Sequence, residues 1–206
     1  MSMETTGAAA PASGYPVRFD VEYPEKLSRL LNNIPYVKAV LLIPHIIVLL
    51  VMWIIAGVLG FIAWWAILFT ARYPRGLFDF VVNVQRWGLN VYGYNAMMRD
   101  EYPPFSGDDG KYPAVSYSVQ YPERLSRLLN NIPYLKSVLL IPHIIVLIFL
   151  IIGWVVVNFI AWWAILFTGR YPRGLFDYSV GVLRWSTRVS AYSSMLTDEY
   201  PPFSLK

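Results

Sequence analysis

Two long apolar stretches dominate the pattern of hydrophobic and polar positions along the chain. The first lies between Lys38 and Arg72 and the second between Lys136 and Arg170, and neither contains a formal charge. An apolar run of more than about 18 residues is typical of a membrane segment rather than of a soluble core helix. The pattern therefore predicts an integral membrane protein.

The two stretches belong to a tandem duplication. Residues 21–106 align with residues 119–204 without a gap, and about two-thirds of the aligned pairs are identical. Two copies are too few for a solenoid, so the duplication predicts one pseudo-symmetric unit. The predicted organisation is a mobile N-terminal tail at 1–14, membrane repeat 1 at 15–106, a polar linker at 107–114 and membrane repeat 2 at 115–206.

Shorter patterns predict the other elements of each repeat. Residues 17–22 alternate between apolar and polar, as do residues 115–119, and this period of two predicts a short strand. Leucines at helical spacing within 24–34 predict a short amphipathic helix that Pro24 opens. Residues 76–98 have one polar face and predict a helix in the interface plane. The proline-rich segment 100–106 predicts an extended cap.

The number of membrane crossings follows from the repeat. Because near-identical flanks require near-identical surroundings, each copy is expected to cross an even number of times. One solution is a hairpin of two helices of about 22 Å with its turn near Gly57–Gly60 and, in the second copy, Gly153–Asn158. The other has 39–70 spanning once and 76–98 spanning back, which places charges at mid-membrane at about 2.5–3.5 kcal/mol each. The hairpin is favoured, and an antiparallel insertion of the two copies stays open.

The predicted fold class is therefore an all-α integral membrane protein with two tandem parallel repeats. Each repeat has an apolar membrane-inserted helical unit, formed as a hairpin or a long helix, together with amphipathic interfacial helices and a short extended cap.

The positions of the charged residues predict what the ends of the apolar stretches contact. The chain has 17 Lys and Arg against 13 Asp and Glu, and the cations cluster beside the apolar runs. This arrangement favours contact with anionic lipid headgroups rather than with nucleic acid. Arginines of the repeated RYPRG segment are suited to grip lipid phosphates bidentately, or to anchor a helix end by snorkelling. The predicted lipid-binding residues are Lys38, Arg72, Arg75, Lys136, Arg170 and Arg173.

Two further groups are candidate sites. Asp79 and Arg86 lie seven residues apart on one helix face, as do Asp177 and Arg184. They predict either an ion path, if that helix is inserted, or the wet face of an interfacial helix.

His45 and His143, the only two histidines, occupy identical contexts. They could ligate a haem or hold a pigment, or each could form a hydrogen bond with a carbonyl or water. The chain has no cysteine, which excludes disulfides and thiolate chemistry. With no catalytic motif in the sequence, we expect no enzyme and no metal site.

The repeated motifs PERLSR, LLIPHIIV, AWWAILFTGRYPRGLFD, RW and DEYPPFS support a family resemblance. The chain resembles a bacterial membrane-domain family, common in actinobacteria and often in tandem, known only as a domain of unknown function. The resemblance covers both repeats and implies no role for any residue.

The expected function is that of a non-enzymatic membrane scaffold or accessory subunit. It would lie in the bacterial cytoplasmic (inner) membrane with cytoplasmic termini, and contact lipids and other membrane subunits or further copies of itself. One alternative is a small transporter or channel with Asp79, Arg86, Asp177 and Arg184 lining a polar path. Another is a haem- or pigment-binding electron-transfer subunit that uses His45 and His143.

Overall fold

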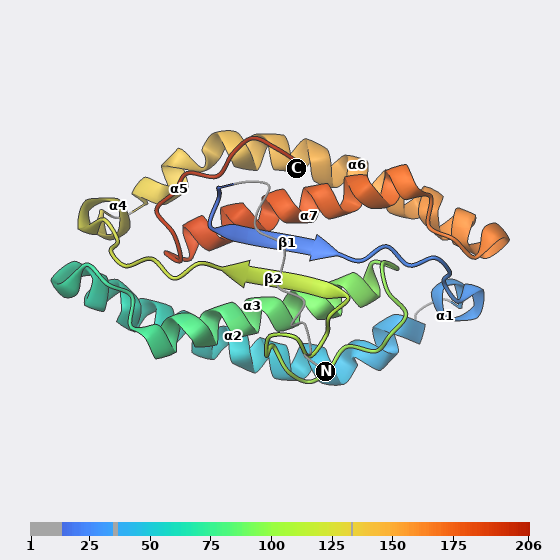
Figure 1. Ribbon diagram of the computed structural model, residues 1–206, viewed down its shortest axis with the longest axis horizontal. Helices are drawn as coiled ribbons and strands as arrows, with labels where there is room; N and C mark the ends of the chain where they lie inside the picture. The colour runs from blue at the N-terminus through green and yellow to red at the C-terminus, as the bar shows by residue number, and fades with distance from the viewer. Residues whose placement is uncertain (1–13, 35–36, 133) are drawn as a thin grey trace, which may run out of the picture.

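The computed structural model describes residues 14–34, 37–132 and 134–206. The predicted tail therefore lies outside the described residues, except for Gly14. Two strands lie side by side at the centre, α3 and α7 flank them, and α2 and α6 form the outer edges (Figure 1). In chain order the elements are β1 (Val17–Val21), α1 (Arg29–Asn33), α2 (Val37–Thr70), α3 (Arg75–Asn95), β2 (Val115–Val119), α4 (Arg127–Asn131), α5 (Leu135–Leu139), α6 (Ile141–Thr168) and α7 (Arg173–Ser193).

The first apolar stretch forms one uninterrupted helix, so the predicted hairpin is wrong. α2 continues for 34 residues, with Gly57 and Gly60 inside it and without the positive φ that a turn would need. A glycine costs a helix only about 1 kcal/mol, which is too little to break a run this apolar. In the second copy the helix is interrupted between α5 and α6, before the predicted turn at Gly153–Asn158. Pro142 occupies the first turn of α6, where its missing N–H needs no partner.

The predicted strands are confirmed, and the predicted short helices form over a smaller range. α1 begins at Arg29 rather than near Pro24, because the Ser28 side chain accepts a hydrogen bond from Leu31 N at 3.2 Å and fixes the N-terminus there. Ser126 caps α4 in the same way through Leu129 N. The residues before each cap are extended and lead out of the strand.

The sheet reveals the symmetry that relates the repeats. β1 and β2 pair antiparallel, and Phe19 lies opposite Tyr117, its own counterpart in the second copy. The two-fold axis of an antiparallel pair is perpendicular to the sheet, so the pseudo-two-fold axis passes between these two residues. Rotation about this axis reverses directions in the plane of the sheet. α2 and α6 accordingly run antiparallel to each other in this plane (Figure 1).

Each repeat contributes a strand and a short helix that pack on the long helices of the other repeat. β1 packs on α7 and α1 on α6, while β2 packs on α3 and α4 on α2. Leu27 N donates to Gly169 O at 2.8 Å, and Leu125 N donates to Ala71 O at the same distance. Because the strand and the short helix of each copy lie on the opposite copy, the two repeats form one folded unit.

The core lies between the sheet and the two inner helices. The buried face of the sheet presents Val17, Phe19, Val21 and Tyr117 to α3 and α7, while the other face is polar and exposed. α2 buries a single narrow stripe against α3. Besides Lys38, this stripe consists of Leu42, His45, Leu49, Ala56, Ala63 and Ile67. The remainder of the long helix is available for other contacts.

The linker approaches α3 closely at Gly107. A Cβ at this position would lie 1.8 Å from the backbone oxygen of Asn83, and Gly107 O accepts a 2.7 Å hydrogen bond from Arg86. We expect Gly107→Ala to lower the free energy of unfolding by about 1–3 kcal/mol, because a helix backbone cannot move aside as a side chain can.

Thermal unfolding in detergent, followed by tryptophan fluorescence, measures the effect of Gly107→Ala. Gly76→Ala is the matched control, since a Cβ there meets nothing within 4 Å and alanine favours a helix. Equal Tm values for the two variants would contradict the close approach.

Candidate functional site

The outer surfaces of α2 and α6 are apolar and exposed. Leu50 is 63% exposed and Phe69 is 70% exposed on α2, and Phe149 and Phe167 are each 69% exposed on α6. Both helices are long and apolar enough to cross a membrane, and only 17% and 11% of their most apolar windows are buried. A core helix of a soluble protein would be mostly buried. The exposed surface therefore fits membrane localisation.

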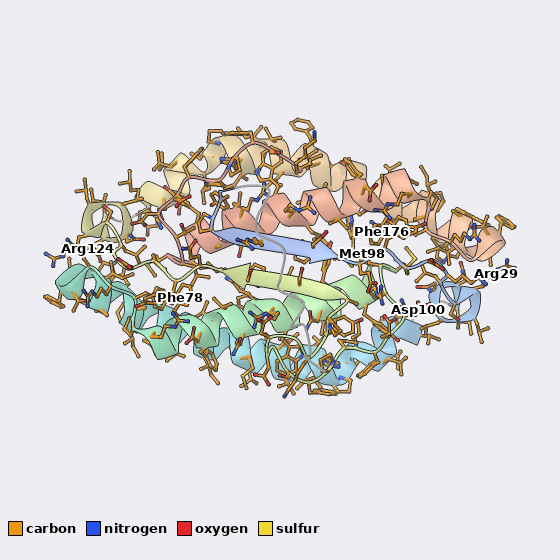
Figure 2. All side chains as sticks on the ribbon, viewed as in Figure 1. Arg29, Phe78, Met98, Asp100, Arg124 and Phe176 are labelled. Atoms are coloured by element: carbon orange, nitrogen blue, oxygen red, sulfur yellow. The ribbon has the colours of Figure 1, made fainter. Side chains whose placement is uncertain are left out.

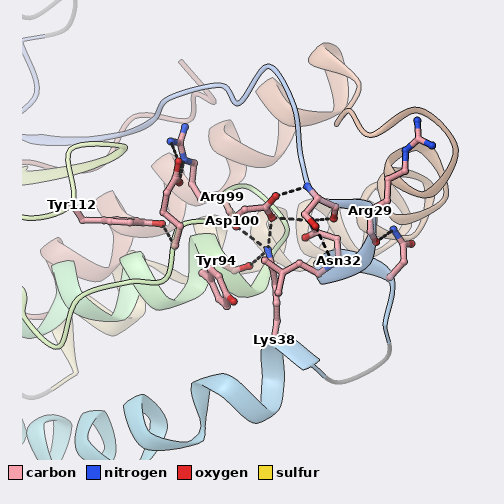
Figure 3. Close-up of polar contacts among 11 residues, drawn as sticks. Arg29, Asn32, Lys38, Tyr94, Arg99, Asp100 and Tyr112 are labelled. Carbon is pink, nitrogen blue, oxygen red and sulfur yellow. Dashed lines mark hydrogen bonds and ion pairs between the residues drawn. The ribbon is translucent and has the colours of Figure 1, made fainter.

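A buried cation ties the start of α2 to the end of α3 (Figure 3). Lys38 Nζ donates to Tyr94 O at 2.9 Å and to Arg99 O at 2.8 Å, and it lies 3.2 Å from Asp100 Oδ1. Asp100 also accepts hydrogen bonds from Ser28 N and, at 2.8 Å, from the Asn32 side chain. One carboxylate therefore joins α1, α2 and the segment that follows α3.

The second repeat builds the same cluster. Lys136 Nζ lies 3.0 Å from Asp198 Oδ1 and donates to Thr197 O at 2.8 Å. Burial lowers the pKa of Lys136, and the Asp198 carboxylate opposes that shift. Lys38 and Lys136 were expected to contact lipid, but their amines are directed inward and only 6% and 7% of these residues are exposed. Their role in this structure is internal anchoring.

The arginines of the RYPRG segments are placed differently from the lysines. Arg72 and Arg170 are exposed, as the predicted lipid contact requires. Arg75 pairs with Asp79 at 3.1 Å and its guanidinium lies 4.7 Å from the Tyr121 ring centroid. In the second copy Arg173 pairs with Asp177 and stacks on Tyr23.

The residues of the predicted ion path form no direct contact with one another, although Asp177 and Arg184 line one polar pocket of about 620 Å³ between β1 and α7. Asp79 lies in the first turn or so of α3 and pairs with an exposed arginine. Arg86 is buried farther along α3, where it donates to Tyr117 O at 2.8 Å and to Gly107 O. Arg184 likewise donates to Phe19 O at 3.0 Å. These arginines hold the strands on the inner helices, which is a structural role.

Each histidine occupies a closed aromatic pocket within its own repeat. His45 Nδ1 accepts a 3.0 Å hydrogen bond from Trp87 Nε1, and the ring stacks on Phe105 with centroids 3.8 Å apart. His143 has the same relation to Trp185, at 2.9 Å, and to Phe203. Both histidines have no exposed surface.

The hydrogen bond from tryptophan to histidine determines whether the histidine could bind the expected haem or pigment. A neutral imidazole that accepts at Nδ1 carries its proton on Nε2, so that neither nitrogen offers a free lone pair to iron. A ligand role would require the tryptophan bond to break. In the arrangement seen here, each ring packs the long helix against the inner helix.

A cavity of about 310 Å³ lies between α3 and α7. Its lining is aromatic, aliphatic and neutral polar, and neither Asp79 nor Arg86 takes part in it. The lining residues include Trp53, Gln85, Tyr92, Tyr117, Leu183 and Thr187. This cavity therefore contains none of the four charged residues that were expected to line a transport path.

Sequence reasoning missed the residues that organise the polar anchors. Asp100 and Asp198 are the hubs, and Trp87 and Trp185 are the histidine partners. The available signal was identity between the copies, since all four residues recur in matching positions. Their partners lie about 40 to 70 residues away along the chain, and no local pattern reports such contacts.

The comparisons with known proteins now identify the class. A family described as "Domain of unknown function (DUF4389)" matches residues 36–107 and 134–204. The chain belongs to this family and contains two copies of its domain, which confirms the resemblance seen in the motifs. Each match begins after the strand and the short helix of its repeat. Searches of curated proteins and of solved structures find no match.

Proposed function

We propose that this protein is a non-enzymatic membrane scaffold or accessory subunit that acts through lipid contact and helix packing. The observation that supports the proposal is the broad apolar surface of α2 and α6, which lies opposite the narrow stripe that each helix buries. Such a surface is suited to lipid and to a second apolar helix alike. The partner is a further copy of this chain or a larger membrane complex.

The polar groups are consistent with this proposal. Buried lysine and arginine side chains bond to backbone carbonyls and to aspartate, as at Lys38, Asp100 and Arg86. These bonds hold the fold and leave the outer helices to make external contacts. The proposal also includes the bacterial cytoplasmic membrane as the location, with both termini on its cytoplasmic side.

Cross-linking from the outer helices tests the scaffold. Because the chain has no cysteine, single cysteines on the exposed faces of α2 and α6 report neighbours directly. Suitable sites, spaced by eight residues so that they lie on different faces of each helix, are Ile46, Ile54, Ile62, Ile144, Ile152 and Ile160. In native membranes we expect oxidation or a short bifunctional maleimide to give a discrete adduct from the sites on one helix face and not from the others.

Two controls define the result. The cysteine-free parent gives the background, and Gly76→Cys reports a site away from the outer helix faces. If every outer site gives no adduct above the parent, neither with itself nor with another protein, the scaffold proposal fails. An adduct that follows the helical period identifies the packing face.

A further inference from the structure

We propose that the protein is monotopic: α2 and α6 lie parallel to the membrane plane within one leaflet, and the pseudo-two-fold axis is along the membrane normal. The sheet then faces water. This inference rests on the membrane location proposed above and specifies the surface and its partner, one leaflet of an anionic bilayer. Four features of the structure support it.

The first feature is the matching chemistry of the two ends. One end carries Lys26, Arg29 and Arg170, which line a shared pocket at the C-terminus of α6. Their counterparts at the C-terminus of α2 are Arg124, Arg127 and Arg72, and Arg127 donates to Phe69 O at 2.9 Å. Figure 2 shows Arg29 and Arg124 at opposite ends of the long axis.

These basic ends distinguish the two orientations. If the long helices crossed the bilayer, one basic end would lie on each side, which opposes the positive-inside preference. If the helices lie flat, both ends lie in the same headgroup layer and both contact anionic phosphate. The near-identity of the two copies then has a direct cause, because the copies face the same surroundings.

The second feature is the polar sheet at the symmetry axis. Arg18 and Asp20 flank Phe19, beside which the axis passes, and both are exposed on the outer face together with Ser116 and Ser118. In a spanning orientation this face would lie at the bilayer midplane. A charge there costs about 2.5–3.5 kcal/mol, and lipid-exposed sheet edges do not occur in hydrocarbon.

The flat orientation removes this cost. The buried face of the sheet packs on α3 and α7, and parts of α2 and α6 pass behind those helices when the molecule is seen from the sheet side (Figure 1). The polar sheet and the apolar helices are therefore on opposite sides along the axis. With the axis normal to the membrane, the sheet is in water while the long helices are in lipid.

The third feature is length. The 34 residues of α2 correspond to about 51 Å, and its apolar part, 39–69, to about 46 Å. Spanning a hydrocarbon core of about 30 Å would require a tilt near 50°, beyond the usual range of about 0–40°. A flat helix about 10 Å in diameter fits within the roughly 15 Å of hydrocarbon in one leaflet.

The fourth feature is the pair of short helices. Leu30 of α1 is 70% exposed and Leu128 of α4 is 69% exposed, each next to an exposed arginine. An exposed leucine beside a cation is typical of a helix that lies in the interface. α1 and α4 are at opposite ends of the molecule (Figure 1), so both lie in the same interface only when the long axis is parallel to it.

Accessibility of two symmetry-related cysteines tests the orientation. Gly76 and Gly174 begin α3 and α7 at opposite ends, and a Cβ at either position meets nothing within 4 Å. Single cysteines there are labelled with a membrane-impermeant maleimide on intact cells and after lysis. We expect Gly76→Cys and Gly174→Cys to behave alike, both protected until lysis or both labelled. Labelling of one and protection of the other would overturn the proposal.

Depth measurement excludes a mixture of two spanning orientations, which would also label both sites equally. Nitroxide labels at Leu41, Gly57 and Phe69 report the start, middle and end of α2 in anionic liposomes. We expect three similar, shallow depths. A centre that is deeper than both ends by 10 Å or more shows a spanning helix and overturns the proposal. Either outcome leaves the cross-linking test of the scaffold function unaffected.

Discussion

Replacing Asp100 with alanine is expected to lower the free energy of unfolding by about 3 kcal/mol. The change leaves the Lys38 amine buried without its carboxylate and removes the acceptor for Ser28 N and Asn32. Removing one partner of a buried ion pair costs about 3–5 kcal/mol. The lower end applies because 24% of the Asp100 side chain is exposed. Thermal unfolding in detergent, followed by tryptophan fluorescence, measures the loss.

The duplication supplies the controls for this prediction. Asp198→Ala removes the matching carboxylate beside Lys136 and is expected to have a similar effect. Asp79→Ala breaks an exposed pair with Arg75 and is expected to cost less than about 1 kcal/mol. The double variant Lys38→Met, Asp100→Ala removes both charges and is expected to recover part of the loss. An Asp100 variant no less stable than the Asp79 variant would refute the anchoring role.

Replacing Trp87 with alanine is expected to cost about 3–5 kcal/mol, as large aromatic deletions in cores do. Trp87 is buried among Leu42, Leu49 and Tyr94, and it satisfies the acceptor nitrogen of His45. Trp87→Phe retains much of the packing and removes only the hydrogen bond, so we expect a smaller cost of about 1–3 kcal/mol. The same unfolding measurement shows which of the two variants loses more stability.

Trp65→Ala is the matched control, because Trp65 is 44% exposed on the outer face of α2 and its replacement is expected to change stability little. If Trp87→Ala is no more destabilising than Trp65→Ala, the pocket does not hold α2 on α3. The same proteins test the haem alternative. A visible absorption band of the purified protein that His45→Ala abolishes and Trp65→Ala retains would establish a ligand.

The monotopic proposal and the scaffold proposal fit together physically. A flat pair of apolar helices presents a long edge within one leaflet, and neighbouring molecules can pack along that edge without an aqueous pore. The internal anchors at Asp100 and Trp87 then keep the helices rigid against the sheet. Loss of an anchor is therefore expected to weaken cross-linking from the outer helices as well as stability.

Local patterns in the sequence predicted the elements well. Alternation predicted β1 and β2, the two charge-free runs predicted long apolar helices, and the polar face of 76–98 predicted an amphipathic helix at α3. The family was also recognisable, because its motifs recur in both copies. Each of these signals depends on residues within a few turns or one strand, so no knowledge of the fold was needed.

Predictions that required a partner were less successful. Lys38 was predicted to contact lipid because it lies beside an apolar stretch. Its acceptors, Arg99 O and Asp100, lie about 60 residues away in the sequence. Gly57 and Gly60 were predicted to form a turn, but the helix continues through them because no surrounding structure stabilises a break. The site residues Asp100 and Trp87 were missed for the same reason, since their roles depend on contacts between distant segments.

The sequence by itself determined that this protein has two copies of one unit with a long apolar segment, because composition and repetition can be read directly along the chain. Only the tertiary structure decided how the copies combine. The pairing of Phe19 with Tyr117 places a two-fold axis through the sheet, makes the long helices antiparallel and exchanges β1 and α1 onto the opposite repeat. The physical reason is that strand pairing and helix packing join residues that are far apart in the sequence. Identical local patterns are therefore compatible with more than one arrangement of the two copies.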